Sequence, residues 1–455
     1  MPQFVLIDPS IAALGGHHYE YAVRVLRAAE QAGYTPVLAA NRAFLGTGPL
    51  PCRVLPAFRY GFFGPPPPRT AGDLLRKLTH RDRSTPQGPS RRASTRASQL
   101  HGLLLRSATS AWHRTAFWRQ RRAFARDSIR MFQGIRLAEG DRVFLPTLSS
   151  AEMLGLLPLF GANPETANAA WHLLFRRDVT GGREGSQQRL RAAFREFHEG
   201  LRGQTVSFHT DTDPLTADYN RLGVACFQTL PIPAADGSHN PKSKIQNPKS
   251  KIHVVYLGDA RLEKGYQWLP RLVEGAVAAG LPVRFTFQSN CSLAAAEPAV
   301  TAARQRLAAL PPHYGVTLVN SPLSSEAYRA LLLSADVVIL PYDREAYRAR
   351  SSGIFAEALA AGIPTLVPAG TWMASQLAPV RQLAELAFAD PADLTKHLAH
   401  VLGHYDLYRR ATQECSLGWS ALHCAEGVIQ RLMALPTPRQ SPSIPRRRRD
   451  CGLER

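Results

Sequence analysis

The chain has 455 residues, about three times the roughly 150 residues of an average domain, so its length excludes a single small module and predicts two domains with extensions. Hydrophobic residues make up 45% of the chain and charged residues 20%, which is ordinary globular usage and excludes a wholly disordered protein. The formal charge of +20 comes from three segments, with +12 in 69–130, +4 in 240–252 and +4 in 436–455, so the rest of the chain is neutral and a nucleic-acid-binding body is not favoured.

The first half of the sequence alternates strand-like and helix-like stretches. Residues 4–8 (FVLID) form a short apolar run, and helical spacing of apolar residues begins at His17. Further strand-like runs lie at 35–40, 142–147, 205–210 and 225–232. This alternation predicts an α/β domain over residues 1–232 with a mostly parallel sheet.

A basic insertion at about residues 65–130 interrupts this pattern. It begins rich in Pro, Arg and Ser and continues as a helix-compatible run in which aromatic residues stand among many arginines, namely Trp112, Phe117, Trp118 and Phe124. Such a run could grip anionic lipid headgroups or nucleic acid. The commoner arrangement is a helix that packs its aromatic side chains on the body and turns its arginines to water.

The second half follows a predicted linker at 233–252, in which the unit NPKSKI occurs twice. Helical stretches are expected to start near Tyr266, Ser325 and Gly353, and strands are expected at 253–258, 283–289, 315–319, 336–342 and 364–368. The pattern predicts a second α/β domain over 253–435 and a disordered basic tail at 436–455. Together the halves predict two doubly wound, Rossmann-like domains facing each other across a cleft, where such sheets bind ligands.

The cysteines and the apolar runs indicate in which cellular compartment the protein is expected. The six cysteines lack CxxC spacing, which indicates no zinc framework, and a reducing cytosol fits this usage best. No basic start followed by an apolar run indicates export, and no apolar run approaches the ~20 residues needed to span a bilayer.

The first candidate site motif is the turn Gly15-Gly16-His17-His18 between a strand and a helix. Glycines let the backbone approach a ligand, and a helix N-terminus offers free N–H groups to an anion. The turn could equally serve only tight packing of helix on strand, and a histidine there is often a surface or capping residue. We expect His17 to face the cleft, with His18, His172 and His209 as further acid–base candidates.

The second motif runs from Gly258 to Gly265 after a strand. Arg261 offers a bidentate fork and Lys264 a mobile point charge, which together could neutralise a leaving diphosphate. The alternative is a solvated surface turn of mixed charge.

The third motif opens a helix with Ser351, Ser352 and Gly353 and continues to Glu357. Backbone N–H groups and hydroxyls at a helix start can bind phosphate, and a carboxylate can accept the hydroxyls of a ribose. Alternatively, a serine is an N-cap and Glu357 an acid favoured by the helix dipole.

Taken together, these motifs resemble the GT-B glycosyltransferases, specifically the large retaining group that uses nucleotide sugars. "GGHHYEYAVRVLRAAEQAGYTPVLA" is similar to that family's opening Gly-Gly loop and helix, "YLGDARLEKGYQWL" to its diphosphate turn, and "SSGIFAEALAAGIPTLVP" to its donor-binding helix. The resemblance covers most of the chain outside the three basic segments.

Two positions depart from the family pattern. The family usually has Arg where this chain has Asp259, and Arg261 could substitute for it. The family also has Glu eight positions before the second glutamate of the donor helix, where this chain has Ala349; Asp343 or Glu345 could compensate.

The resemblance implies a metal-independent, retaining hexosyltransferase without a cofactor, whose substrates are a UDP-, GDP- or ADP-sugar and a glycan or lipid-linked acceptor. The implied donor site comprises Gly15, Gly16, Gly258, Ser351, Ser352, Gly353 and Glu357, and the implied catalytic residues are His17, Arg261 and Lys264. The implied setting is bacterial surface polysaccharide or glycolipid assembly in the cytoplasm, with the basic segments reaching an anionic membrane surface. A catalytically silent nucleotide-binding scaffold and a basic nucleic-acid-binding protein are the alternatives.

Overall fold

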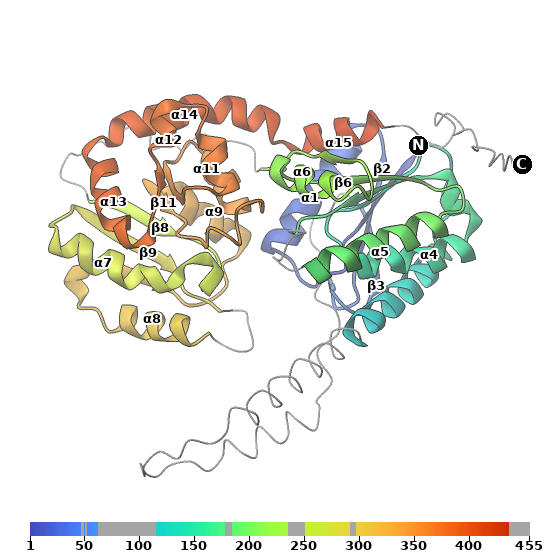
Figure 1. Cartoon of the computed structure of the whole chain (residues 1–455), viewed down its shortest axis with the longest axis horizontal. Coiled ribbons are helices and arrows are strands. Elements are labelled where there is room, and N and C mark those ends of the chain that lie inside the picture. Colours follow the sequence, from blue (N-terminus) through green and yellow to red (C-terminus); the bar gives the residue numbers. More distant parts are fainter. Residues whose placement is uncertain are drawn as a thin grey trace, which may run out of the picture.

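The computed structural model describes residues 1–46, 50, 52–61, 115–177, 184–234, 251–291 and 297–435, and these form two parallel sheets covered by helices (Figure 1). Most of the predicted insertion, linker and tail lie outside the described residues, as does Trp112. No helix among the described residues is both long enough and apolar enough to cross a membrane.

The first sheet has seven parallel strands in the order β3-β2-β1-β4-β5-β6-β7. The strands are β1 (Gln3–Ile7), β2 (Thr35–Asn41), β3 (Arg53–Phe58), β4 (Arg142–Leu145), β5 (Ala170–Leu174), β6 (Thr205–Thr210) and β7 (Phe227–Thr229). Its helices include α1 (Gly16–Gln31), α4 (Ser150–Ala162), α5 (Glu184–Gly200) and α6 (Asp213–Arg221). The strand order reverses between β1 and β4, which is where open sheets of this kind bind ligands.

The second sheet has six strands in the order β10-β9-β8-β11-β12-β13. They are β8 (Ile252–Tyr256), β9 (Val283–Gln288), β10 (Val316–Val319), β11 (Val337–Ile339), β12 (Thr365–Pro368) and β13 (Ala387–Phe388). Its helices are α7 (Leu269–Ala278), α8 (Pro298–Ala308), α9 (Ser325–Ser334), α10 (Gly353–Ala360), α11 (Trp372–Leu377), α12 (Arg381–Ala384), α13 (Leu394–Gly403) and α14 (Tyr405–Leu422).

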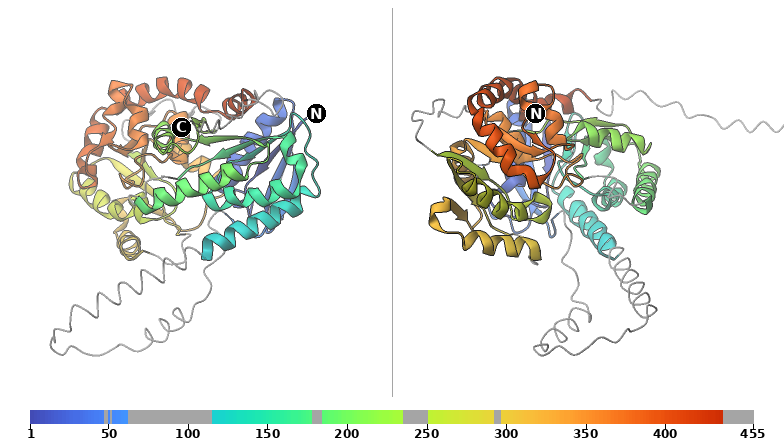
Figure 2. Two further views of the ribbon diagram at one scale, coloured as in Figure 1. Left: turned by 45° about the vertical axis from the view of Figure 1, so that its right-hand side comes forward. Right: turned by 60° about the vertical axis from the view of Figure 1, so that its left-hand side comes forward.

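Alternation of side chains along β1 explains how the first sheet acquires two apolar faces. Val5 and Ile7 point into the cluster under α4 and α5, whereas Phe4 and Leu6 point into the cluster under α1. α4 and α5 lie side by side on one face, as Figures 1 and 2 show from three directions. A sheet buried on both faces is typical of doubly wound folds, so the predicted α/β architecture is confirmed.

The strand expected at 225–232 is shorter than predicted. Only Phe227–Thr229 pair with β6, because the chain after Thr229 leaves the sheet and crosses to the other half. The helix expected near Tyr266 begins at Leu269, after a 3₁₀ turn at Tyr266–Trp268.

The last described helix, α15 (Ala425–Met433), packs on the first sheet rather than the second. Its residues Val428, Ile429 and Leu432 are buried in the same cluster as Leu26 of α1. In Figure 1, α15 lies beside the N-terminal strands and helix. The predicted second domain, 253–435, therefore ends with a helix that completes the core of the first.

A buried arginine holds the end of α15. Arg142 on β4 is 4% exposed, and its guanidinium donates to the carbonyl oxygens of Leu432 (2.6 Å) and Met433 (3.0 Å) and to the Tyr34 hydroxyl (3.1 Å). Carbonyl groups at a helix C-terminus lack intrahelical donors, so the guanidinium supplies the missing bonds.

The aromatic residues of the predicted insertion have different environments. The helix at 115–132 buries Phe124, which stacks on Phe58 at a ring distance of 5.3 Å, and half-buries Phe117. Trp118 is 51% exposed. The packed-helix interpretation therefore holds for Phe124 and Phe117 and fails for Trp118.

The two chain crossings between the halves meet at His423. Its Nδ1 accepts the backbone N–H of Ile232 at 3.1 Å, its carbonyl accepts that of Ala234 at 3.0 Å, and its ring stacks on Trp419 at 3.8 Å. Burial lowers the pKa of His423 to about 4, with weaker opposing effects of Asp213 and Arg431. The neutral ring is the form that this corner requires.

We expect unfolding free energy to fall between pH 6.5 and 4, in part through His423. Its pKa is lower when folded than when unfolded, so its stabilising contribution is complete above pH 6.5 and is lost as the unfolded chain takes up the proton. The lowered pKa of His423 corresponds to a loss of roughly 3 kcal/mol of unfolding free energy by pH 4. In urea unfolding at pH 7, 6, 5 and 4, H423Q should show a shallower loss than wild type, whereas H313Q, a change at an exposed site, should not. Equal slopes for all three proteins would contradict this assignment.

Candidate active site between the two sheets

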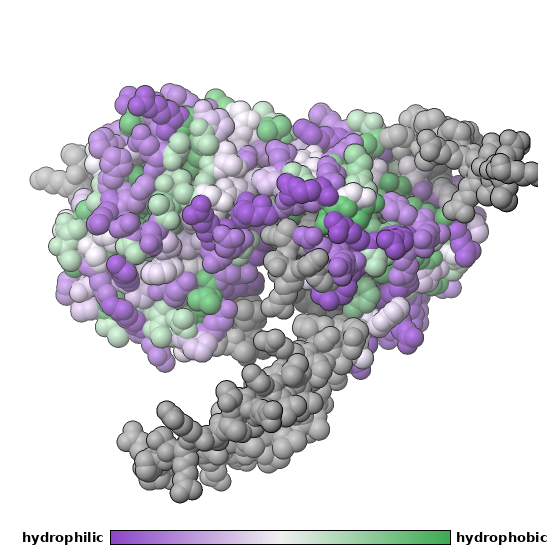
Figure 3. Space-filling model, in the orientation of Figure 1, coloured by the Kyte–Doolittle hydropathy of each residue, from purple (hydrophilic) through white to green (hydrophobic). Residues whose placement is uncertain are grey.

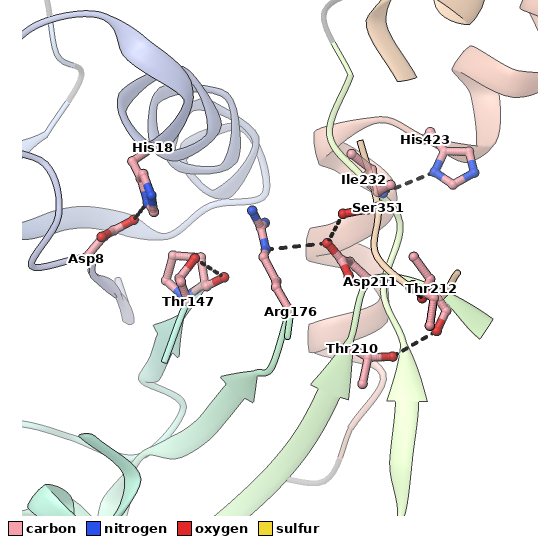
Figure 4. Close-up of polar contacts among 12 residues, drawn as sticks. Asp8, His18, Thr147, Arg176, Thr210, Asp211, Thr212, Ile232, Ser351 and His423 are labelled. Carbon is pink, nitrogen blue, oxygen red and sulfur yellow. Dashed lines mark hydrogen bonds and ion pairs between the residues drawn. The ribbon is translucent and has the colours of Figure 1, made fainter. Parts of the chain in front are cut away.

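Polar side chains gather where the strands of the first sheet end, facing the second half (Figure 4). Asp8 directly follows β1, Thr147 follows β4, Arg176 follows β5 and Asp211 directly follows β6. Because parallel strands end at one edge of a sheet, residues far apart in sequence meet there. In the space-filling view, hydrophilic residues predominate on the visible described surface where the two halves meet (Figure 3).

Asp8 and His18 form a pair at the ligand-binding edge of β1. The His18 Nδ1 lies 2.8 Å from Asp8 Oδ2, and the other carboxylate oxygen accepts the backbone N–H of Ser10 at 2.9 Å. Asp8 is 2% exposed, and these two hydrogen bonds fix the orientation of its carboxylate. With Nδ1 donating to Asp8, Nε2 of His18 is left as the acceptor for a substrate hydroxyl.

His17 lies between the two halves, as expected from the sequence. A Cβ atom on Gly353, the first residue of α10, would lie 3.1 Å from its ring. Desolvation by the surrounding protein, followed by the positive charge of Arg176, lowers the pKa of His17 to about 3. A neutral imidazole with cations around it is a hydrogen-bonding group rather than a cation at pH 7.

The glycine turn before α1 adopts backbone angles that other residues avoid. Gly15 and Gly16 both have φ of 79°. A Cβ atom on Gly15 would lie 3.4 Å from the Ser325 hydroxyl of α9, and that hydroxyl donates to Glu20 of α1. The turn therefore does more than pack helix on strand, since it also lies against the second half.

The predicted diphosphate turn places Lys264 against Gly258. Gly258 has φ of 100°, and a Cβ atom there would lie 2.7 Å from Lys264 Nζ and 2.9 Å from the Ile354 side chain. Burial, followed by the positive charge of Arg261, lowers the pKa of Lys264 to about 8. An ammonium held in a confined position gains from the arrival of an anion.

Arg261 is paired within its own turn. Its guanidinium lies 2.8 Å from Asp259 and 3.8 Å from Glu263. The expected substitution of Arg261 for the missing family arginine is therefore weakened, because Asp259 offsets its charge.

The start of α10 uses its two serines differently. Ser352 is the N-cap, and its Oγ accepts the backbone N–H of Phe355 at 3.2 Å, as the capping alternative predicts. Ser351 instead donates to Asp211 across the cleft at 2.6 Å (Figure 4). Arg176 Nε lies 3.6 Å from the same carboxylate oxygen, so the helix start meets a charged group of the first half.

Glu357 faces the first half, as predicted, and is paired there. Its carboxylate accepts a 2.9 Å hydrogen bond from Arg24 of α1, whose other terminal nitrogen donates to the carbonyl of Pro233. Glu357 is the fifth residue of α10 and not in its first turn, which removes the helix-dipole alternative.

No protein-family model and no curated protein sequence matches this chain. Solved structures do match, over nearly its whole length. The α,α-trehalose-phosphate synthase (UDP-forming) from Burkholderia xenovorans in complex with glucose-6-phosphate has a TM-score of 0.62 at 11% identity, covering 95% of this chain and 99% of that one. The E. coli trehalose-6-phosphate protein bound with UDP-2-fluoro glucose has a TM-score of 0.60 at 11% identity, covering 96% and 100%. The N-terminal domain of Candida albicans trehalose-6-phosphate phosphatase has a TM-score of 0.63 at 12% identity, covering 95% and 97%.

The chain has the GT-B fold. The two-domain architecture and the resemblance inferred from the sequence are thereby confirmed. In this GT-B chain the three motifs singled out from the sequence lie where the two sheets meet: α1 begins opposite α10, and the Gly258 turn lies against Ile354 of α10.

The position of the missing family glutamate, Ala349, is buried, and two carboxylates lie earlier in the same loop. Ala349 is 1% exposed, and its carbonyl accepts the Thr212 hydroxyl at 2.5 Å. Asp343 uses a carboxylate oxygen for the backbone N–H of Ala346, and Glu345 is exposed. Asp211, from the other half, is the carboxylate that the structure places beside Ser351.

Two histidines named as acid–base candidates lie in the core of the first half of the GT-B fold. His172 and His209 are both 0% exposed, and their facing nitrogens are 3.3 Å apart. Burial lowers the pKa of both, so they are neutral structural groups. Both are therefore removed as candidates for acid–base work in the cleft, because neither is exposed to solvent.

Sequence reasoning missed Asp8, Arg24, Arg176 and Asp211. Three of these follow strand ends of the first sheet, which is the signal that could have found them. Among the described residues, no group of three or more His, Cys, Asp or Glu could hold a metal ion.

Proposed function

We propose that the protein is a glycosyltransferase that moves a sugar from a nucleotide donor to an acceptor hydroxyl. The observation that carries this proposal is the convergence of the glycine turn, the Lys264 turn and the start of α10 in a GT-B fold. A fold shared at this level of identity does not fix activity, so the proposal rests on the residues at the site.

The donor is bound mainly by the second half. Lys264 and the N-terminal N–H groups of α10 at Gly353 stabilise charge on the departing diphosphate, and Glu357 holds the ribose. Arg24 must release Glu357 or share it when the ribose arrives, because the two groups are in contact without ligand.

The acceptor lies against the first half. His18, oriented by Asp8, accepts a hydrogen bond from an acceptor hydroxyl, and His17 at the helix start faces the donor helix. We propose retention of configuration without a metal or cofactor, in which the leaving phosphate takes the proton of the incoming hydroxyl. Closure of the two halves excludes water and thereby hydrolysis.

We further propose a role in bacterial surface polysaccharide or glycolipid assembly, at the inner face of the plasma membrane. The support is the basic composition of the predicted insertion and tail, which suits an anionic surface carrying lipid-linked acceptors. Liposome co-sedimentation that is unchanged by removing residues 69–130 and 436–455 would count against membrane association.

The donor site is tested by nucleotide binding. We expect one of UDP, GDP, ADP and CMP to raise the melting temperature of the wild type, because a ligand that binds only the folded state stabilises it. The shift should be lost in E357A and in K264A, and retained in E326A, which removes an exposed carboxylate of α9. Retention of the full shift in E357A and K264A would place the nucleotide elsewhere.

A catalytically silent nucleotide-binding scaffold is the second candidate. It is favoured by the pairing of Arg261 with Asp259 and by the burial of Ala349. Saturable nucleotide binding with no release of diphosphate from any donor would favour this scaffold over the enzyme.

A further inference from the structure

We propose that Arg42, Arg59 and Arg126 form a second anion site, which binds a phosphate group carried by the acceptor or by a lipid headgroup. The three arginines come from separate elements, since Arg42 follows β2, Arg59 follows β3 and Arg126 lies on the helix at 115–132. They converge on one carboxylate, Asp127. The site belongs to the first half and does not depend on the proposed donor site in the second.

The geometry places three guanidinium groups around a single buried carboxylate oxygen. Asp127 is 2% exposed, and its Oδ1 lies 3.5 Å from Arg42 Nη2, 3.7 Å from Arg59 Nε and 4.0 Å from Arg126 Nε. Its Oδ2 accepts the backbone N–H of Arg59 at 3.1 Å. Asp127 therefore gathers the cations and fixes the loop after β3 against the helix.

The charges of this cluster do not balance. One carboxylate faces three guanidinium groups, which leaves an excess of two positive charges. Arg42 also donates through Nε to the carbonyl of Ala57, but within the described ranges the guanidinium nitrogens of Arg59 and Arg126 make no hydrogen bond shorter than 3.5 Å. The three side chains are 38%, 38% and 54% exposed, so a ligand can reach their N–H groups. Planar guanidinium groups match the oxygens of a phosphate.

The surroundings favour a phosphate attached to a larger molecule. β2 and β3 run parallel to β1, so Arg42 and Arg59 lie on the same sheet edge as Asp8, on the acceptor side. A small cavity beside Asp127 is lined by the rings of Phe58, Tyr60 and Phe124 and by the polar side chains of Gln120 and Glu152. Exposed arginines continue along the helix at spacings of three and four residues, at positions 119, 122, 126 and 130. A phosphate bound here can carry an organic group across the exposed surface formed by these arginines.

The first arm of the test uses inorganic phosphate. In calorimetric titration at low ionic strength, the double variant R42Q/R59Q should lose about tenfold or more of the phosphate affinity found in the wild type. The control R271Q/R284Q makes the same change of charge at exposed arginines of the second half and should bind as the wild type does. Phosphate binding at the Lys264 turn is common to all three proteins and cancels in the comparison. R126Q serves as a second variant if R42Q/R59Q unfolds at the temperature of the titration.

The second arm distinguishes the two sources of phosphate. Flotation with phosphatidylcholine vesicles, with and without phosphatidylglycerol, reports on a lipid headgroup. Loss of anionic-vesicle binding in R42Q/R59Q identifies a headgroup site, whereas loss of inorganic phosphate binding alone identifies a soluble phosphorylated acceptor. If R42Q/R59Q binds phosphate and vesicles as R271Q/R284Q does, or if the wild type binds neither, the proposal is overturned. Vesicle binding that persists in R42Q/R59Q counts against a headgroup site, and it overturns the proposal when phosphate binding is unchanged as well.

Discussion

Replacing Lys264 with methionine is expected to lower the rate of sugar transfer by about 10²- to 10³-fold, the usual effect of removing one group that stabilises developing charge. Methionine retains the apolar stem that lies against Gly258 and Ile354 but removes the ammonium. The effect should fall on kcat more than on KM, because the charge on the diphosphate grows as the sugar departs. Release of nucleoside diphosphate from the donor found in the binding screen measures it.

The matched control for this change is R261M. Because Arg261 is already paired with Asp259, removing the Arg261 guanidinium should lower the transfer rate less than removing the Lys264 ammonium. A pH profile separates charge from packing: Lys264 has a pKa of about 8 without ligand, so nucleotide affinity should fall as pH rises above 8 in the wild type and stay flat in K264M. Transfer by K264M at the wild-type rate would remove Lys264 from the mechanism.

Replacing Arg142 with methionine is expected to destabilise the protein by about 3 to 5 kcal/mol. The change leaves the carbonyl oxygens of Leu432 and Met433 without donors at the end of α15 and unpairs the Tyr34 hydroxyl. Urea unfolding measures the loss. Hydrogen exchange should show that the loss of stability is local: in R142M, amide exchange should be faster in α15 than in α14.

The control for R142M is R53M, at an exposed arginine of β3. It should change stability by less than about 0.5 kcal/mol, as surface substitutions do. Equal stability of R142M and R53M would mean that the buried network around Arg142 does not hold α15 in place.

The sequence predicts the strands whose apolar runs are unbroken and misses those that are interrupted. β5 (AWHLL) carries His172 in its centre, and β3 (RVLPAF) carries Pro56, so neither matches a simple strand pattern. In the structure His172 is buried beside His209 and Arg142, which lie on the two neighbouring strands but 37 and 30 residues away in sequence, so no local pattern encodes these contacts.

The packing of α15 on the first sheet could not be predicted from the sequence of the helix itself. Its apolar residues show that the helix has a buried face, but not which sheet covers it. Its position on the first sheet depends on long-range contacts with Arg142 of β4 and Leu26 of α1.

At the site, the motifs themselves were predictable and their partners were not. Gly258, Lys264 and Glu357 stand in local patterns that indicate phosphate and ribose binding. Arg24 lies 333 residues before Glu357, and Asp211 lies 140 residues before Ser351, so both pairings depend on how the two halves meet. The same holds for Asp8 and His18, since a strand end and a helix start come together only once the glycine turn is folded.

The most direct test of the central claim is diphosphate release from a panel of UDP-, GDP- and ADP-sugars, incubated with the protein and an extract of glycan and lipid-linked acceptors. We predict that one donor yields diphosphate in an acceptor-dependent manner, and that K264M abolishes most of this release. Tight binding of a nucleotide sugar without diphosphate release from any donor would contradict glycosyl transfer and identify the chain as a nucleotide-binding scaffold.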